Sequence, residues 1–166
     1  NGHATTTRAD EAKSQGSKSA DSGKSEAKSE ASQLPPASIT HHTIKVGGVP
    51  PDYTAEAGTV ALPGSGGKTA ADIFYVAYTR DPKNTKRPIT FVFNGGPGAA
   101  ATYLHLGGIG PRVVEVNAKG ELQGPPPALA DNPSTWLDMT DLVFVDPVGT
   151  GYSRASEAKD EEKFWG

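Results

Sequence analysis

The stretch PITFVFNGGPG, residues 88–98, indicates the fold of this sequence more clearly than any other segment. It begins with an apolar run of the kind found in buried strands, and the run passes directly into a cluster of glycines. A second segment, DLVFVDPVGTGYS at residues 141–153, has the same order of a buried strand and a glycine-rich turn. We therefore expect both strands to lie inside a sheet, with the glycine amides at its C-terminal edge.

Runs of strand type also precede residue 88. They cover residues 40–46, 53–62 and 72–79, and clusters of glycine or proline separate them. This pattern predicts an antiparallel meander. In the last run, alternate residues on both faces are apolar or aromatic, which suits a sheet that is covered on both sides.

Shorter elements are expected between the two apolar strands. Residues 99–106 are good helix formers, sufficient for about two turns, and Gly107 and Gly108 are expected to stop the helix. Residues 111–116 predict a short strand. Gly124 and the prolines at residues 125–127 exclude regular structure there.

The N-terminal part has a different composition. Residues 1–38 are mainly Ala, Ser, Lys and Glu, and Leu34 is the one large aliphatic residue before residue 39. Such a segment cannot bury enough apolar area to offset its ordering entropy, so we expect a disordered tail followed by a folded part at residues 39–166. Because the sequence begins with Asn1 instead of Met, we expect a signal peptide upstream and a secreted or periplasmic protein.

Charge and composition exclude several classes of function. A formal net charge of −3 gives no field that favours nucleic acid or an anionic membrane surface. The absence of cysteine excludes disulfides, thiolate nucleophiles and Cys-ligated metals. No apolar run approaches the length of about 20 residues that a membrane-spanning helix needs. His41 and His42 point to opposite faces of a strand, so we expect no metal ion there. We also expect no cofactor.

The glycine-rich loop at residues 94–101 has three interpretations. It can be a plain turn, in which glycine serves only the bend of the backbone. It can be a dinucleotide fingerprint, since Gly96, Gly98 and Ala101 have the spacing and Glu115 lies near the offset of a ribose-binding acid. Against this interpretation, Pro97 removes a backbone N–H donor from the loop, and the following helix is too short to cross over between parallel strands. Third, it can be an oxyanion loop, whose amides stabilise a carbonyl oxygen that becomes negative.

Taken in order, residues 93–98, 106–111, 132–133 and 142–153 resemble the serine carboxypeptidase family, in a bacterial-type member. The resemblance covers about residues 39–154. It implies an α/β fold of the α/β-hydrolase type, with a mixed sheet. This chain would supply only its N-terminal part, an antiparallel meander that leads into central strands.

The resemblance also implies a function, the release of residues from the C-termini of peptides by a Ser-Asp-His triad. The family's serine lies in a Gly-Glu-Ser-Tyr-Gly turn, which this sequence lacks, so the nucleophile, acid and base are expected outside it. Asn94 and Gly95 correspond to substrate-binding residues, with Asn94 on the terminal carboxylate, and Gly96 to an oxyanion-hole donor. The expected partners are the C-terminus of a peptide and the C-terminal part of the same protein.

The chain departs from the family pattern at residues 99–101, which are all alanine, and at Gly108, where many relatives have a carboxylate-binding Glu. Ser153 lies in an imperfect match to a nucleophile turn, and we expect it to be a turn residue. We expect His105 to pack or cap instead of acting in catalysis. Two rival functions stay open, a non-catalytic binding or assembly remnant of the same fold and a dinucleotide-binding oxidoreductase.

Overall fold

The computed structural model describes residues 36–45, 51–95 and 98–165, all of which belong to one compact unit, residues 31–166. The proposed tail at residues 1–38 lies almost entirely outside the described residues. Its disorder therefore stays a prediction.

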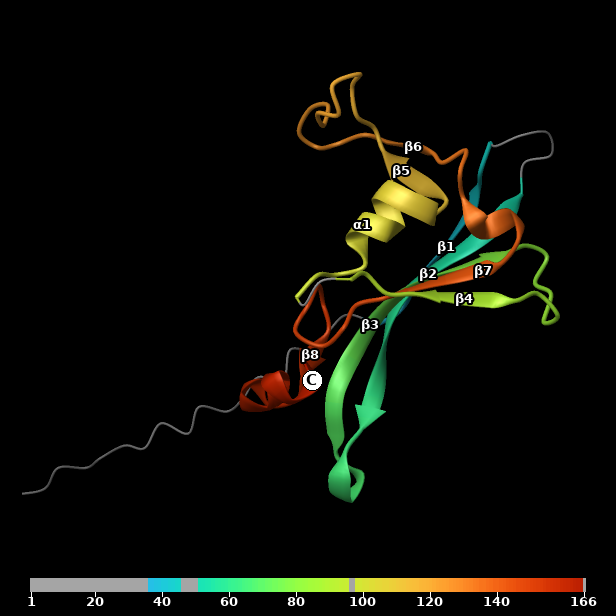
Figure 1. The fold of residues 1–166 in the computed structure, drawn as a ribbon. Helices are drawn as coiled ribbons and strands as arrows, with labels where there is room; N and C mark the ends of the chain where they lie inside the picture. The colour runs from blue at the N-terminus through green and yellow to red at the C-terminus, as the bar shows by residue number, and fades with distance from the viewer. Residues whose placement is uncertain (1–35, 46–50, 96–97, 166) are drawn as a thin grey trace, which may run out of the picture. The chain divides into compact units, whose positions relative to one another are not determined.

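A six-stranded sheet forms the centre of this unit (Figure 1), with the order β1-β2-β3-β7-β4 and with β8 paired to β3. The strands are β1 (Ser38–Thr43), β2 (Asp52–Pro63), β3 (Thr69–Arg80), β4 (Ile89–Val92), β7 (Asp141–Val145) and β8 (Arg154–Ala155). A separate two-stranded sheet contains β5 (Arg112–Val114) and β6 (Leu129–Asp131). The helices are short: η1 (Ser65–Gly67), α1 (Thr102–Leu104), η2 (His105–Ile109), η3 (Trp136–Asp138) and η4 (Ala158–Phe164).

The pairing directions confirm a mixed sheet that is entered through an antiparallel meander. β1, β2, β3 and β7 pair antiparallel in turn, whereas β4 pairs parallel to β7. In the parallel pair, Val92 lies opposite Phe144, so both strands end at the same edge of the sheet. The two glycine-rich segments that follow β4 and β7 therefore start side by side.

The predicted helix at residues 99–106 has the wrong bounds. α1 begins at Thr102 and continues without interruption as the π-helical η2, which runs through both Gly107 and Gly108. The side chain of Asn132 explains the continuation, because its Nδ2 donates hydrogen bonds to the carbonyl oxygens of Gly108 at 2.7 Å and Gly110 at 2.8 Å. Carbonyls that would otherwise end a helix without partners are satisfied from outside.

The hydrophobic core joins the sheet to the helical segment after the glycine loop. Tyr78, Leu142 and Phe144 of the central strands are buried, and Ala101, directly before α1, is buried with them. Leu137 of η3 also belongs to this core. The end of the glycine loop is therefore anchored in the core.

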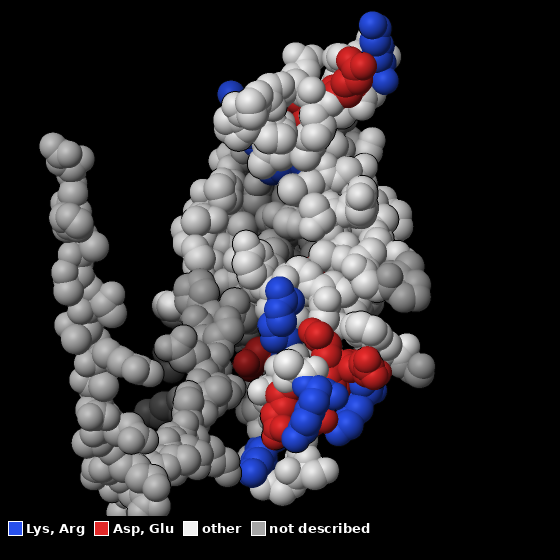
Figure 2. All heavy atoms as spheres, turned by 90° about the vertical axis from the view of Figure 1, so that its left-hand side faces the viewer, with Lys and Arg blue, Asp and Glu red and all other residues white. Residues whose placement is uncertain are grey.

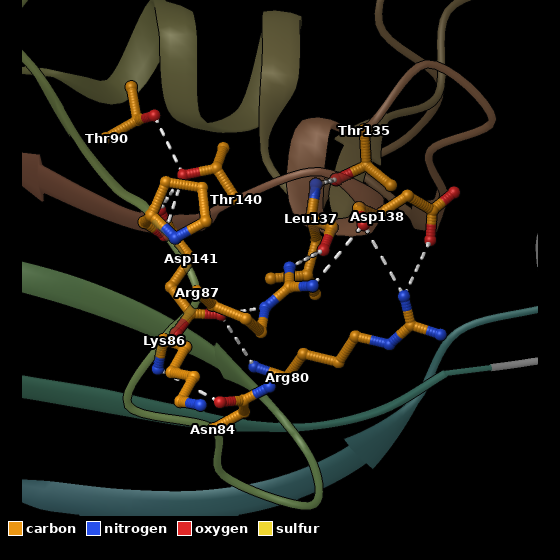
Figure 3. A network of polar contacts seen from close by, with 11 residues as sticks. Arg80, Asn84, Lys86, Arg87, Thr90, Thr135, Leu137, Asp138, Thr140 and Asp141 are labelled. Atoms are coloured by element: carbon orange, nitrogen blue, oxygen red, sulfur yellow. Dashed lines mark hydrogen bonds and ion pairs between the residues drawn. The ribbon is translucent and has the colours of Figure 1, made fainter.

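The opposite end of β7 is held by an ion pair, which Figure 3 shows. Nε of Arg87, in the loop before β4, lies 3.0 Å from Oδ1 of Asp141, and both side chains are largely buried. Arg87 also donates to the carbonyl oxygen of Leu137 at 2.6 Å, and the backbone N–H of Arg80 donates to Asp141 at 3.1 Å. One carboxylate thus ties β3, β7 and the start of β4 together.

Charged side chains on the face in Figure 2 are intermixed and do not separate by sign. Helix η4 is an example, because Lys163 pairs with Asp160 at 2.6 Å and Lys159 pairs with the preceding Glu157 at 2.6 Å. This face has no patch of one sign of the kind that attracts nucleic acid. Among the described helices, none is long and apolar enough to cross a membrane.

Replacing Arg87 by Ala should lower the free energy of unfolding by about 3 kcal/mol, because it leaves the carboxylate of Asp141 largely buried without its cation. Chemical denaturation of the full-length protein measures this loss. Arg80 is the matched control, since its contact with Asp138 is 4.0 Å long and much more exposed. Arg80→Ala should cost less than about 1 kcal/mol. Equal losses in the two variants would contradict the assigned importance of the buried pair.

Candidate functional site

The candidate site lies at the edge of the sheet where β4 and β7 both end. In open α/β sheets, ligands bind outside the carboxyl ends of the parallel strands. One loop, residues 93–101, follows β4, and one turn, residues 146–153, follows β7. Of the loop residues singled out from the sequence, Asn94 and Gly95 lie at this edge.

Asn94 and Gly95 open the loop. The side chain of Asn94 is partly exposed, and its Nδ2 donates to the carbonyl oxygen of Gly95 at 2.9 Å. Gly95 is exposed, and no atom lies within 4 Å of the position that a Cβ would take. Gly98 has a φ of +84°, a conformation that favours glycine. Gly96, the expected oxyanion donor, lies outside the described residues.

The carboxylate of Asp146 closes the other side of the edge. This side chain is nearly buried, and its Oδ1 accepts a hydrogen bond of 2.8 Å from the backbone N–H of Ala101. Its backbone N–H donates to the carbonyl oxygen of Phe74 at 3.1 Å. Asp146 therefore links β3 to the residue at which the glycine loop ends and α1 begins.

Behind the loop, His105 and Tyr78 form a largely buried pair. The phenol oxygen of Tyr78 lies 2.5 Å from Nε2 of His105, and the imidazole stacks on Phe144 with ring centroids 4.6 Å apart. Burial lowers the pKa of His105 to about 4, against a weaker opposing effect of the carboxylate of Asp146. Burial also raises the pKa of Tyr78. At neutral pH the imidazole is therefore uncharged, and it supports α1 by packing and by its contact with Tyr78.

A pocket of about 220 Å³ lies between this pair and the turn, lined in part by Thr102, His105, Asp146 and Tyr152. A larger hollow of about 410 Å³ lies between η4 and the end of the β2–β3 hairpin, away from the strand ends. The smaller pocket is the relevant one for the site, because it adjoins the glycine loop.

Comparison with known proteins shows the family of the chain. Residues 49–164 match the serine carboxypeptidase family. The chain belongs to the serine carboxypeptidase family. It is similar to serine carboxypeptidase-like 44 from Arabidopsis thaliana, with 29% identity over 99 residues, which are 56% of this chain and 18% of that protein.

Among solved structures, the chain is similar to that of Kex1Δp, a prohormone-processing carboxypeptidase from Saccharomyces cerevisiae. The identity is 29%, the TM-score is 0.45, and the match covers 69% of this chain and 23% of that chain. The chain thus spans less than a quarter of the length of either relative.

Membership of the serine carboxypeptidase family directs attention to Ser153, the one serine near the edge that resembles a nucleophile. Its side chain is fully buried. The hydroxyl donates to the carbonyl oxygen of Asp146 at 2.6 Å and accepts from the backbone N–H of Phe74 at 2.8 Å. A hydroxyl with these two partners ties the turn to β3. Ser153 is therefore a turn residue, as expected from the sequence.

The structure brings Asn94 and Gly95 to the same edge as the 146–153 turn. His41 and His42 lie on β1, which pairs with β2 and not with the strands of the site. His41 Nδ1 contacts Oγ1 of Thr54 at 3.0 Å and His42 stacks on Tyr53, so each histidine has its own neighbours. Within the described residues, no group of three or more His, Asp or Glu side chains could hold a metal ion.

Asp146 and Asn132 had no predicted role, yet they hold the two ends of the helical segment after the loop. A signal for Asp146 was present, since an acidic residue at the end of an apolar strand has no charged neighbour in sequence to pair with. The dinucleotide interpretation loses its support, because α1 has only three residues and the loop precedes no helix of crossover length.

His105→Gln should make the stability of the full-length protein less sensitive to acid. The folded protein keeps His105 neutral down to a pKa of about 4, whereas an ordinary histidine has a pKa of 6.5. The unfolded chain therefore binds the extra proton first, and stability is lost as the pH falls from 6.5 towards 4. Between about pH 7 and about pH 4.5 the wild type should lose about 2 kcal/mol more than His105→Gln. The same loss in both proteins would place the acid-sensitive group elsewhere.

Ser153→Ala should leave labelling of the full-length protein by a fluorophosphonate unchanged, because a buried hydroxyl with two backbone partners cannot reach the probe. Mass spectrometry of the labelled protein locates the modified serine. The variant should still lose about 1–3 kcal/mol of stability, since the N–H of Phe74 loses its acceptor. A fluorophosphonate adduct on Ser153 would make this residue the nucleophile and overturn its assignment to the turn.

Proposed function

We propose that the protein containing this chain is a serine-type carboxypeptidase and that this chain contributes the loop that binds the substrate's C-terminus. Its family supports a carboxypeptidase-like function. The observation that carries the finer proposal is the position of Asn94 and Gly95, at the shared carboxyl edge of β4 and β7. A peptide with a free C-terminus is the proposed substrate.

Asn94 would recognise the terminal carboxylate. An amide nitrogen carries two N–H donors, and a carboxylate is acceptor-only when ionised, so the two groups are complementary. The contact from Asn94 to the carbonyl of Gly95 is a local one, and a substrate carboxylate would compete for the same donor. Gly96 would donate its backbone N–H to the oxyanion that forms when the peptide carbonyl is attacked.

The nucleophile, its base and the acid that orients the base would come from the rest of the protein. In the described part of the chain, β4 is an edge strand that pairs with β7 alone. Ile89, Phe91 and Phe93 are each more than half exposed on or next to this strand. Apolar side chains on an unpaired edge favour association with a further part of the sheet, so the chain alone is proposed to be inactive.

Asn94→Ala in the full-length protein should raise KM for peptides with a free C-terminus by about ten- to a hundredfold, the effect of losing one hydrogen bond to a charged group. KM for ester or C-terminally amidated substrates should change much less. Steady-state kinetics on matched pairs of substrates measure the difference. Asn94→Asp should raise KM for free C-termini more than Asn94→Ala does, because it places a second negative charge beside the substrate carboxylate.

The control for this experiment is Asn117→Ala. Asn117 lies in a surface turn, where its side chain contacts Glu121. Its replacement should leave KM for both substrate classes unchanged. Equal losses on free and blocked C-termini in Asn94→Ala would remove Asn94 from the carboxylate-binding role.

The rival proposal is a non-catalytic binding or assembly protein of the same fold. Fluorophosphonate labelling of the full-length protein separates the two, because a remnant would have no activated serine to react. The expectation of a secreted or periplasmic location stays a prediction.

A further inference from the structure

Two aspartates lie at opposite ends of β7, and both are nearly buried. Asp141 starts the strand and has the cation of Arg87 beside it. Asp146 directly follows the strand at the candidate site, and it makes no ion pair with the described residues. Burying a carboxylate without a cation costs free energy, so the other groups that it contacts must offset this cost.

Those contacts come from two separate segments of backbone. Oδ1 accepts from the N–H of Ala101 at 2.8 Å, and Oδ2 lies 3.4 Å from the N–H of Tyr152. Ala101 is the last residue before α1, where a backbone N–H has no acceptor inside the helix. The carboxylate supplies that acceptor, and it does so where the glycine loop ends.

The turn is shaped around the same carboxylate. Gly151 has a φ of +49°, and a Cβ at this position would collide with Oδ2 of Asp146. The methyl group of Ala100 lies 3.3 Å from the same position, so the loop and the turn meet there. The end of the loop at Ala100 and Ala101, the carboxylate and the turn are therefore in close contact.

We infer that Asp146 is a positioning residue that fixes the glycine loop, through the amide of Ala101, for the reaction proposed above. The loop then has two anchors, the pairing of β4 at Asn94's end and the carboxylate of Asp146 at the end of residues 94–101. The role proposed for Asp146 needs no contact between its carboxylate and the substrate. The carboxylate sets where the loop amides stand when charge develops on the substrate oxygen, and small displacements of such donors have large effects on rate.

The test compares Asp146→Ala, Asp146→Asn and the control Asp141→Ala in the full-length protein, with active sites counted by fluorophosphonate titration. Asp146→Ala should lower kcat per titrated site by about ten- to a hundredfold. Asp146→Asn should restore it to within about threefold of the wild type, since the amide oxygen still accepts from Ala101. Asp141→Ala should lose stability and keep its kcat per site, because it lies at the other end of the strand.

A second measurement does not depend on activity. Hydrogen exchange of the peptide segment that contains Ala101 should be faster in Asp146→Ala than in Asp141→Ala under native conditions. If the wild type is active but Asp146→Ala keeps wild-type kcat and exchange, the positioning role is overturned and the proposed function stands. If the wild type neither hydrolyses peptides nor takes the label, the proposed function fails, and the exchange comparison alone decides for or against the positioning role.

Discussion

The parallel pairing of β4 with β7 is the constraint on which the rest of this structure depends. The other pairings of the main sheet are antiparallel, and antiparallel neighbours would carry the two glycine-rich segments to opposite edges. Because this one pair is parallel, Asn94 and Asp146 leave the sheet at the same edge. The site is therefore a consequence of strand direction before it is a consequence of any side chain.

The two ends of β7 have different roles: one stabilises the fold and the other adjoins the candidate site. At the start of the strand, Asp141 and Arg87 form a largely buried ion pair that joins the loop before β4 to β7. At its end, a second buried carboxylate binds backbone amides in place of a cation. Similar side chains thus have different partners, and the partners differ because one end adjoins a charged loop and the other a glycine loop.

The sequence predicted the strands well because their signals are local. Apolar runs and glycine or proline breakers gave β2, β3, β4 and β7 to within a few residues. It failed for α1 and η2, because the side chain that lets the helix pass Gly107 and Gly108 comes from Asn132, distant in the chain. The role of Asp146 was missed for the same reason, since its hydrogen bond to Ala101 spans 45 residues. Contacts of this kind depend on the sheet pairing and cannot be derived from periodicity.

We propose that the loop after β4 receives the C-terminus of a peptide. The most direct test is a crystal structure of the full-length protein with a bound peptide that has a free C-terminus. We expect the terminal carboxylate within hydrogen-bond distance of Nδ2 of Asn94, at the common edge of β4 and β7. A peptide whose C-terminal carboxylate lies away from this edge, with Asn94 still bonded to Gly95, would contradict it.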